Sequence, residues 1–318
     1  MMSEESQDSV STKFGYAGLV GRPNAGKSTL LNQILGSKLA ITSPKPQTTR
    51  NQIAGIHTDE RMQVVLVDTP GIHECWTELN RVMVDQSHEV LGQVDVVCWL
   101  MDLTRLAANQ DAGRPVFDEQ DLRLAERVDR GRQRLILIGN KVDLLPREQV
   151  LPLIAAAQAQ FGDAPFVPLS ARSGENVGGL MKEMCAALPV GPAMYPEEDW
   201  TQVTERFLVS EVIRHQLYKL LSKELPYCAT VEIVQFDEAQ RDHKGLVRVY
   251  AQIIVERGSQ KGIVIGKGGT MLKKIGTLAR QEIEELLECR VYLDLLVKVE
   301  KDWTRTRAGL GRAGFLRP

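Results

Sequence analysis

At 318 residues the chain is long enough for about two domains of ordinary size, each with a core of its own. Its composition is 43% hydrophobic and 25% charged, and 39 basic residues against 41 acidic ones give a formal net charge of −2. This balance excludes a nucleic-acid partner held by overall charge, so such binding needs a local basic patch. The longest apolar runs, such as 96–101, are far shorter than the roughly 20 residues of a membrane-spanning helix.

The termini and the cysteines indicate where the protein works. Residues 1–13, MMSEESQDSVSTK, are polar and acidic without the apolar core of a signal peptide, which predicts a disordered lead-in. The five cysteines are scattered without a CxxC pair. That pattern favours a reducing compartment over a disulfide framework. We therefore expect a cytoplasmic protein.

The N-terminal part, residues 14–189, alternates short apolar runs with helical stretches, the pattern of an α/β domain with a mostly parallel sheet flanked by helices. Ligands of such sheets bind beyond the carboxyl ends of the strands. Polar or glycine-rich motifs follow directly after several of the runs, and they predict the position of the site. The expected strands are 16–20, 62–67, 95–101, 135–138 and 166–169.

A phosphate-binding loop follows the first expected strand. The sequence GRPNAGKS at 21–28 is a full GxxxxGK[ST] motif that opens a helical stretch. Backbone N–H groups of this glycine-containing loop and the helix N-terminus can surround phosphate oxygens. We expect Lys27 to reach the β- and γ-phosphates and the Ser28 hydroxyl to bind Mg²⁺. The residues expected to bind nucleotide here are Gly21, Arg22, Pro23, Asn24, Ala25, Gly26, Lys27, Ser28 and Thr29.

The second motif is Asp68-Thr69-Pro70-Gly71, at the end of the strand 62–67. The Asp68 carboxylate can hold Mg²⁺ through water, and the Gly71 amide can move to the γ-phosphate and report its presence. An isolated DxPG would be an ordinary turn. Its order and distance after the phosphate-binding loop favour the functional interpretation.

Specificity for the base is expected from Asn140-Lys141-Val142-Asp143. The two carboxylate oxygens of Asp143 can accept the N1–H and the 2-amino group of guanine, whereas adenine would leave a buried carboxylate without partners, at a cost of about 1–3 kcal/mol or more. We expect the stem of Lys141 to lie along the base. Ser170-Ala171, after the last expected strand, would offer a backbone N–H to the guanine oxygen. The motif therefore predicts GTP rather than ATP.

Taken in order, these motifs resemble the translation-factor-like class of small GTPases. The resemblance implies a switch segment in the sequence PQTTR at 46–50 with a threonine that binds Mg²⁺. We expect this to be Thr49, with Thr48 as the alternative. Arg50 could be an internal arginine finger, but a solvated loop arginine is the preferred interpretation.

The position after Gly71 is Ile72, where Ras-like enzymes carry a water-orienting glutamine. In this respect the chain resembles GTPases that have a hydrophobic residue at this position. That resemblance implies that Asn24 helps to hold a K⁺ ion in place of an arginine finger. The alternative is that Asn24 is only a tolerated polar residue. The expected catalytic residues are Asn24, Lys27, Thr49 and Gly71, and the expected metal ligands are Asn24, Ser28, Thr49 and Asp68.

The proline-rich stretch 190–204 predicts a linker, after which the pattern changes to a helix, two strands, a glycine-broken helix pair and a last strand over 205–302. Residues 257–280 contain six basic and no acidic side chains around a GxxG turn. Glycines permit close approach of a nucleic-acid strand, and we expect the apolar residues 263–265 to form a floor for bases. The expected RNA-binding residues are Ile265, Gly266, Lys267, Gly268, Gly269, Lys273 and Lys274.

This element order resembles the type II KH domain, which implies binding of unpaired RNA. The two halves together resemble the bacterial Era GTPases over about residues 14–315, in motifs such as GRPNAGKSTLLN, QTTRNQIAGI, DTPGI, NKVDLL and VIGKGG. The resemblance implies a GTP-dependent switch that binds the 3′ end of 16S rRNA in assembly of the small ribosomal subunit, binds no DNA and associates partly with the cell membrane as a peripheral protein.

Three segments depart from that family pattern without touching the motifs: the long lead-in, the longer segment 104–118, and the arginine-rich tail 303–318, which could add phosphate contacts. The alternatives are another assembly or tRNA-modifying GTPase, a non-catalytic RNA tether that binds GTP structurally, and an ATP-dependent RNA remodeller, which Asp143 opposes.

Overall fold

The computed structural model describes residues 12–42, 45, 49–71, 78–312 and 315, so that Thr48 and Ile72 lie outside the described residues. The chain divides into two compact units. The first comprises Met1–Ser37, Ile53–Thr69 and His88–Gln202. The second comprises Lys38–Gln52, Pro70–Ser87 and Val203–Pro318. Of the described residues in the predicted switch motifs, Thr49, Arg50, Pro70 and Gly71 therefore fall in the second unit, and Asp68 and Thr69 fall in the first.

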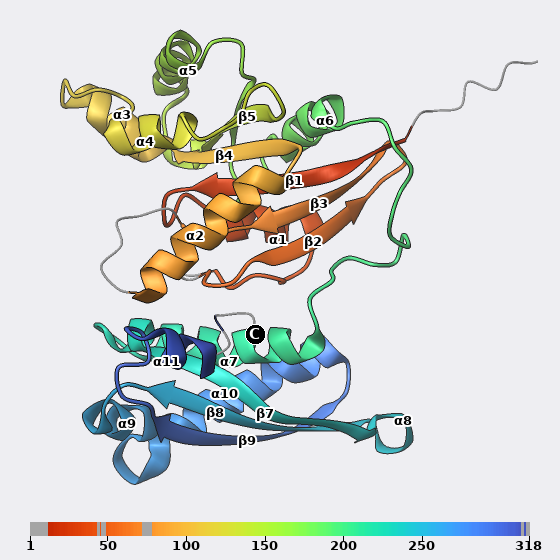
Figure 1. The fold of residues 1–318 in the computed structure, drawn as a ribbon, viewed down its shortest axis with the longest axis vertical. Coiled ribbons are helices and arrows are strands. Elements are labelled where there is room, and N and C mark those ends of the chain that lie inside the picture. Colours follow the sequence, from red (N-terminus) through yellow and green to blue (C-terminus); the bar gives the residue numbers. More distant parts are fainter. Residues whose placement is uncertain (1–11, 43–44, 46–48, 72–77, 313–314, 316–318) are drawn as a thin grey trace, which may run out of the picture. The chain divides into compact units, whose positions relative to one another are not determined.

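The first unit is built on a six-stranded sheet in the order β2-β3-β1-β4-β5-β6. Neighbouring strands are parallel except β2 and β3, which are antiparallel. Helices lie on both faces of this sheet (Figure 1), which confirms the predicted α/β class. The strands are β1 (Lys13–Gly21), β2 (Ile53–Thr58), β3 (Met62–Asp68), β4 (Val96–Asp102), β5 (Arg134–Asn140) and β6 (Phe166–Leu169).

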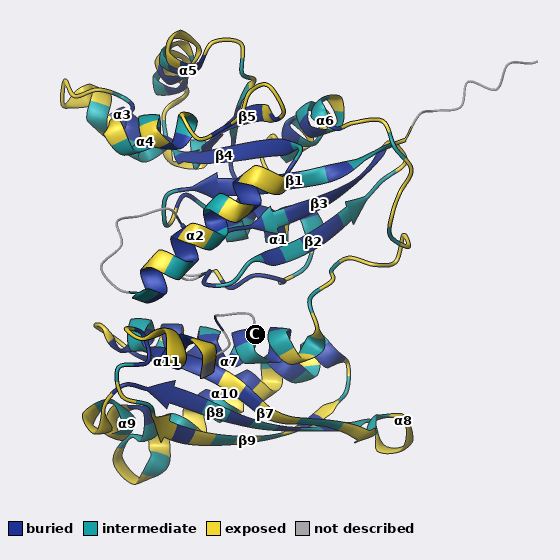
Figure 2. Ribbon diagram, viewed as in Figure 1, coloured by how far each residue is buried: buried dark blue, intermediate teal, exposed yellow. Residues whose placement is uncertain are grey.

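The central strands are nearly continuous apolar runs because both of their faces are covered. In β4 only the last residue is not fully buried, as the dark strands in Figure 2 show. Among the described residues, none of the helices is both long and apolar enough to cross a membrane. The helices of this part are α1 (Lys27–Leu35), α2 (Glu78–Gln93, whose first residues belong to the second unit), α3 (Leu103–Asp111), α4 (Glu119–Ala125), η1 (Val142–Leu144), α5 (Arg147–Phe161) and α6 (Val177–Ala187).

The sequence analysis missed β2, the antiparallel edge strand. Its sequence, IAGIHT, is short and ends in half-exposed polar residues, so it lacks the apolar run that identified the other strands. In the sequence, residues 53–56 belong to the motif QTTRNQIAGI, which was read together with the switch segment. An edge strand needs only one buried face, which weakens its sequence signal.

Part of the predicted linker 190–204 pairs with this edge of the sheet. The Ile56 N–H donates to the carbonyl of Trp200 at 2.8 Å, and the Thr201 hydroxyl donates to the carbonyl of Ala54 at 2.6 Å. The Gln63 side chain accepts the N–H of Tyr195 at 2.9 Å. The first unit consequently extends to Gln202.

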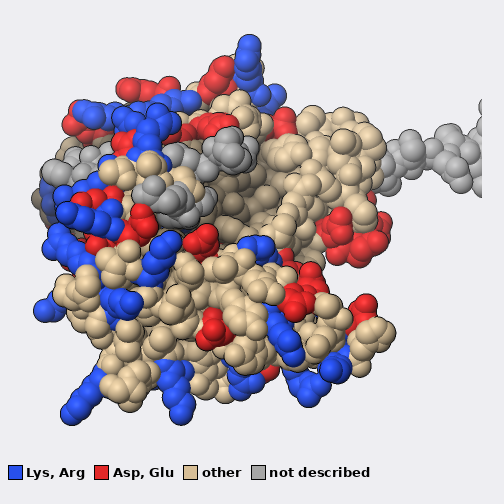
Figure 3. Space-filling view, turned by 60° about the horizontal axis from the view of Figure 1, so that its bottom comes forward, with Lys and Arg blue, Asp and Glu red and all other residues tan. Residues whose placement is uncertain are grey.

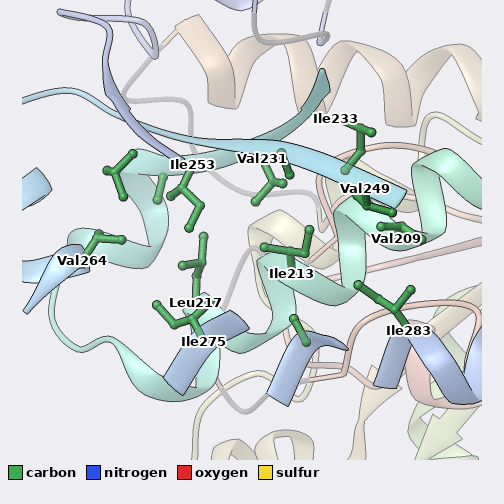
Figure 4. Close-up of a cluster of buried hydrophobic side chains, with 14 of the residues drawn as sticks. Val209, Ile213, Leu217, Val231, Ile233, Val249, Ile253, Val264, Ile275 and Ile283 are labelled. Atoms are coloured by element: carbon green, nitrogen blue, oxygen red, sulfur yellow. The ribbon is translucent and has the colours of Figure 1, made fainter. Parts of the chain in front are cut away.

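The second unit has a three-stranded sheet, β7-β8-β9, in which β7 and β8 are antiparallel and β8 and β9 are parallel. The order α7-β7-β8-α9-α10-β9 confirms the predicted KH arrangement. Side chains from α7, α10 and the sheet fill one core (Figure 4). The elements are α7 (Glu205–Leu220), η2 (Leu225–Cys228), β7 (Ala229–Gln240), α8 (Arg241–Lys244), β8 (Leu246–Val255), α9 (Gly258–Ile265), η3 (Lys267–Gly269), α10 (Thr270–Leu287), β9 (Arg290–Val299) and α11 (Arg307–Arg312).

The C-terminal tail packs on this unit through its apolar residues. Trp303 and Leu310 are fully buried, together with Leu79, Met83, Ile254 and Phe315. The indole N–H of Trp303 donates to the carbonyl of Cys228 at 3.0 Å. The sequence analysis emphasised the arginines of the tail, whereas its aromatic and leucine side chains fix its position.

Candidate nucleotide site and RNA interface

The phosphate-binding loop joins β1 to α1, and its glycines are structural requirements. Gly26 has φ +103°, and a Cβ there would lie 2.0 Å from the amide nitrogen of Asn140. A Cβ at Gly21 would lie 2.3 Å from the carbonyl oxygen of Leu100. No side chain fits in either gap, so both predicted glycines are needed for the loop to close.

Lys27 lies inside this loop with 6% of its surface exposed. Its ammonium group donates to the carbonyls of Gly21 and Arg22, at 3.1 Å each. Burial lowers the pKa of Lys27, and the charge of Asp68 opposes that shift. Phosphate oxygens would be further acceptors for the ammonium group and would favour the charged lysine.

The predicted metal ligands Ser28 and Asp68 are adjacent. The Ser28 hydroxyl donates to the Asp68 carboxylate at 2.6 Å. The parallel register pairs Leu19 with Asp68, and the Thr69 hydroxyl donates to the carbonyl of Leu19 at 2.9 Å, which fixes the end of β3 beside β1. A hydroxyl and a carboxylate are hard oxygen ligands of the kind Mg²⁺ prefers, so this donor set fits the ion.

Asn140 connects three of the predicted motifs. Its side-chain amide donates to the carbonyl of Ala25 at 2.7 Å, and its side-chain oxygen accepts the N–H of Ala171 at 2.9 Å. Asn140, Ser170 and Ala171 are all buried. The Asn140 side chain therefore links the segments predicted to bind the base to the phosphate-binding loop.

The backbone donors predicted for the guanine oxygen already have partners. The N–H of Ser170 donates to the carbonyl of Glu175 at 3.1 Å, and that of Ala171 donates to Asn140. Ser170 is fully buried. A contact with guanine thus requires Ala171 to share its N–H.

Asp143 lies in η1 at the end of β5 and is exposed, so a base can reach its carboxylate. Lys141 has φ +71° and its ammonium group contacts Asp102 at 2.5 Å. Burial would raise the pKa of Asp102, but the hydrogen bonds from Lys141 and Thr104 outweigh it and lower the pKa. The sequence analysis missed Asp102, whose signal was its place at the end of β4.

Thr49, Pro70 and Gly71 belong to the second unit. Arg50 also belongs to the second unit, and only 1% of it is exposed. It is therefore not the solvated loop arginine that the sequence favoured, and its guanidinium group is not available as an arginine finger in this structure. Its guanidinium group donates to the carbonyls of Ala229 (2.8 Å), Pro226 (2.9 Å) and Tyr227 (2.9 Å) and to the hydroxyl of Tyr218 (3.1 Å).

Replacing Arg50 by alanine is expected to destabilise the second unit by about 3 kcal/mol or more, because several buried oxygens would lose their donor. Urea-induced unfolding would measure the loss. Arg307→Ala, at an exposed position of α11, serves as the control and is expected to have little effect. Equal unfolding midpoints for the two variants would contradict the structural role of Arg50.

The predicted GxxG turn connects α9 to α10. Gly266, Gly268 and Gly269 all have positive φ, and a Cβ at Gly266 would lie 2.7 Å from that of Met271. Gly268 and Gly269 have open space around their Cα atoms. Lys267 is exposed on the turn, as are Lys273 and Lys274 on α10. In Figure 3, basic side chains project from the lower part of the molecule with few acidic ones among them.

A groove of about 400 Å³ lies beside this turn. Its wall carries Lys273 and Arg280 from α10, and Leu293 and Leu295 come from β9. Its lining residues are Gly269, Leu272, Lys273, Gly276, Thr277, Arg280, Leu293 and Leu295. An apolar groove with cations at its wall suits bases and phosphates together.

The apolar floor predicted at 263–265 is wrong in its central residue. Val264 is fully buried and points into the core (Figure 4), while Ile263 is 57% exposed. In a helix the three consecutive side chains point in different directions, so they cannot form one floor. Leu293 and Leu295 of β9 provide the apolar surface instead.

Comparison with known proteins agrees with this geometry. Residues 16–141 match the family described as 50S ribosome-binding GTPase, and residues 224–304 match the KH domain. A GTPase Era of Geobacter metallireducens is 44% identical over 95% of this chain and 98% of its own length. A GTPase Era of Syntrophus aciditrophicus is 43% identical, over 96% of each chain.

Two solved structures resemble the whole chain. One is a variant of Aquifex aeolicus Era bound to GDP and AlF₄⁻, and the other is Era in complex with MgGDPNP and nucleotides 1506–1542 of 16S ribosomal RNA. Each has a TM-score of 0.87 and 34% identity and covers 96% of this chain and 100% of its own. The predicted GTP-hydrolysing activity and the predicted family are confirmed, and this chain belongs to the Era family of GTPases.

Proposed function

We propose that this GTPase binds the unpaired 3′ end of 16S rRNA in the groove beside its GxxG turn and acts in assembly of the small ribosomal subunit. The observation that carries the proposal is that groove, where Lys273 and Arg280 of α10 border the apolar side chains of β9, beside the turn that carries the exposed Lys267. The complex of an Era relative with nucleotides 1506–1542 supports the same ligand.

The proposal is tested by binding of the purified protein to a synthetic RNA with the 3′-terminal sequence of its own 16S rRNA. An RNA of the same composition in shuffled order is the control, and both are measured with a GTP analogue and with GDP. Tighter binding of the natural sequence supports the proposal. Equal binding of both RNAs would contradict the proposal, because it would show that the groove binds phosphates without sequence preference.

We propose further that Mg²⁺ assists at the nucleotide through Ser28 and Asp68, with Thr49 from the switch segment as a third ligand. The bound ion would neutralise charge on the phosphate oxygens. The hydrogen bond between Ser28 and Asp68 supports this arrangement, as does the magnesium nucleotide in the relative's complex. A cytoplasmic location and peripheral contact with the inner face of the membrane stay predictions.

We propose that Asn24 helps to hold a K⁺ ion, as the sequence predicted. Asn24 is exposed in the phosphate-binding loop with φ +62°, a left-handed conformation that asparagine adopts more readily than most residues. Hydrolysis is expected to be at least about tenfold faster in KCl than in NaCl at equal ionic strength, because the cation would replace part of an arginine finger. Asn24→Ala should remove the difference. Indifference of the wild type to the cation would reject the role of K⁺.

A further inference from the structure

The first unit contains a cluster of two arginines and two aspartates whose ion pairs are not part of the predicted phosphate, metal or base contacts. Arg22 is the second residue of the phosphate-binding loop, and Arg105 lies on α3. Asp118 is the N-cap of α4, and Asp121 lies in its first turn with a side chain 3% exposed. The cluster includes the end of the segment 104–118, which departs from the family pattern.

Both carboxylates are shared by both guanidinium groups. The Nε of Arg22 contacts Asp121 at 3.1 Å, and its Nη2 contacts Asp118. Arg105 contacts Asp118 at 3.1 Å and Asp121 at 2.7 Å. Partial burial and the shared geometry make this network stronger than an isolated surface ion pair.

The aspartates are held in place by the helix that they begin. The Asp118 carboxylate accepts the N–H groups of Gln120 at 3.0 Å and Asp121 at 3.2 Å, and Asp121 accepts the N–H of Asp118 at 3.1 Å. This reciprocal pair is a capping box, which fixes both side chains. Arg22 therefore contacts a rigid acceptor.

The main-chain carbonyl of Arg22 also helps to hold the phosphate-binding loop in its closed shape. Its carbonyl accepts the ammonium group of Lys27 at 3.1 Å and the N–H of Ala25 at 3.3 Å. The Arg22 side chain is held by the two aspartates. Arg22 thus supplies one of the two carbonyls that hold Lys27, the loop's predicted contact with the β- and γ-phosphates.

We propose that Asp118 and Asp121 are positioning residues for GTP: by holding Arg22 they keep the start of the phosphate-binding loop and Lys27 in the shape that receives the γ-phosphate. A loop ordered before binding loses less conformational freedom when the ligand arrives. GDP has no γ-phosphate and keeps its contacts with the loop amides. Loss of the aspartate charges should therefore weaken GTP more than GDP.

The test is the double variant Asp118→Asn with Asp121→Asn. Asparagine is also a good N-cap, so α4 keeps its start while the charges are removed. We expect the affinity for a non-hydrolysable GTP analogue and the single-turnover hydrolysis rate to fall about tenfold, and the GDP affinity to change less than about threefold. Arg22→Gln, which leaves the contacts of Arg105 intact, should reproduce this change in the GTP-to-GDP ratio.

Two controls separate positioning from stability. Glu119→Gln removes the contact with Arg123 at 2.6 Å on the same helix and should change neither nucleotide affinity. Arg105→Gln should lower the melting temperature but preserve the GTP-to-GDP ratio, because Arg22 keeps both carboxylates. An unchanged ratio in both the double variant and Arg22→Gln, or equal loss of the two nucleotides, would overturn the proposal.

Discussion

Replacing Lys267 and Gly268 together by aspartate is expected to abolish measurable RNA binding and leave GTP affinity unchanged. Lys267 is exposed on the turn and Gly268 has open space around it, so the new side chains meet no steric obstacle in the folded protein. The substitution replaces a cation by two anions where phosphates would lie, and the resulting repulsion opposes binding. Gly268 has φ +59°, a conformation that aspartate tolerates better than most residues.

The measurement is titration of a fluorescent 3′-terminal 16S rRNA fragment, with GTP affinity measured on the same preparations. Lys301→Asp, at an exposed position just after β9, is the control for the reversal of one lysine charge. It should weaken RNA binding far less than the double substitution. Unaltered RNA affinity of the double variant would show that the groove and its turn are not the RNA site.

Asp143→Asn is expected to weaken GTP binding about 100-fold, because two charge-assisted hydrogen bonds to guanine would be lost or weakened. Xanthosine triphosphate carries an oxygen in place of the 2-amino group, and the new amide can donate to it. The variant should therefore prefer xanthosine over guanosine triphosphate. The RNA affinity of the variant in the absence of nucleotide should equal that of the wild type.

Competition against a fluorescent guanine nucleotide measures these affinities. Asp163→Asn, another exposed aspartate of the first unit, is the matched control and should behave as the wild type. If Asp143→Asn retained full GTP affinity and no preference for xanthosine, the assignment of Asp143 to the base would be wrong.

The elements that the sequence predicted are those whose signal is local. The apolar runs of the central strands, the loop GRPNAGKS and the GxxG turn each lie within a few consecutive residues. Their conformations follow from glycine placement and from burial on both faces of a sheet. These local signals were sufficient for the fold class and for most of the nucleotide site.

The features that the sequence missed depend on residues far apart in the chain. Arg50 is buried by Tyr218 and Ala229, 168 and 179 positions further on, and no short pattern records such a partnership. The fixation of Arg22 by the α4 capping box likewise joins residues 96 to 99 positions apart. Long-range contacts of polar side chains have no periodicity that a sequence alone reveals.

The RNA groove shows an intermediate case. In the sequence of β9, Leu293 and Leu295 fall at every second position with Val291 and Val297, which puts all four on one face. Val291 and Val297 are buried, whereas the two leucines are half-exposed beside α10. The pattern predicted the face, but only the packing of α10 shows which part of it stays open.

The proposed nucleotide site depends on selection of guanine by Asp143 and on retention of the phosphates by the loop ending at Ser28. Calorimetric titration of the purified wild-type protein with GDP and with ADP, in the presence of Mg²⁺, tests it most directly. We expect tight binding of GDP and binding of ADP at least about 100-fold weaker. Equal affinity for the two nucleotides, or no binding of GDP, would contradict it.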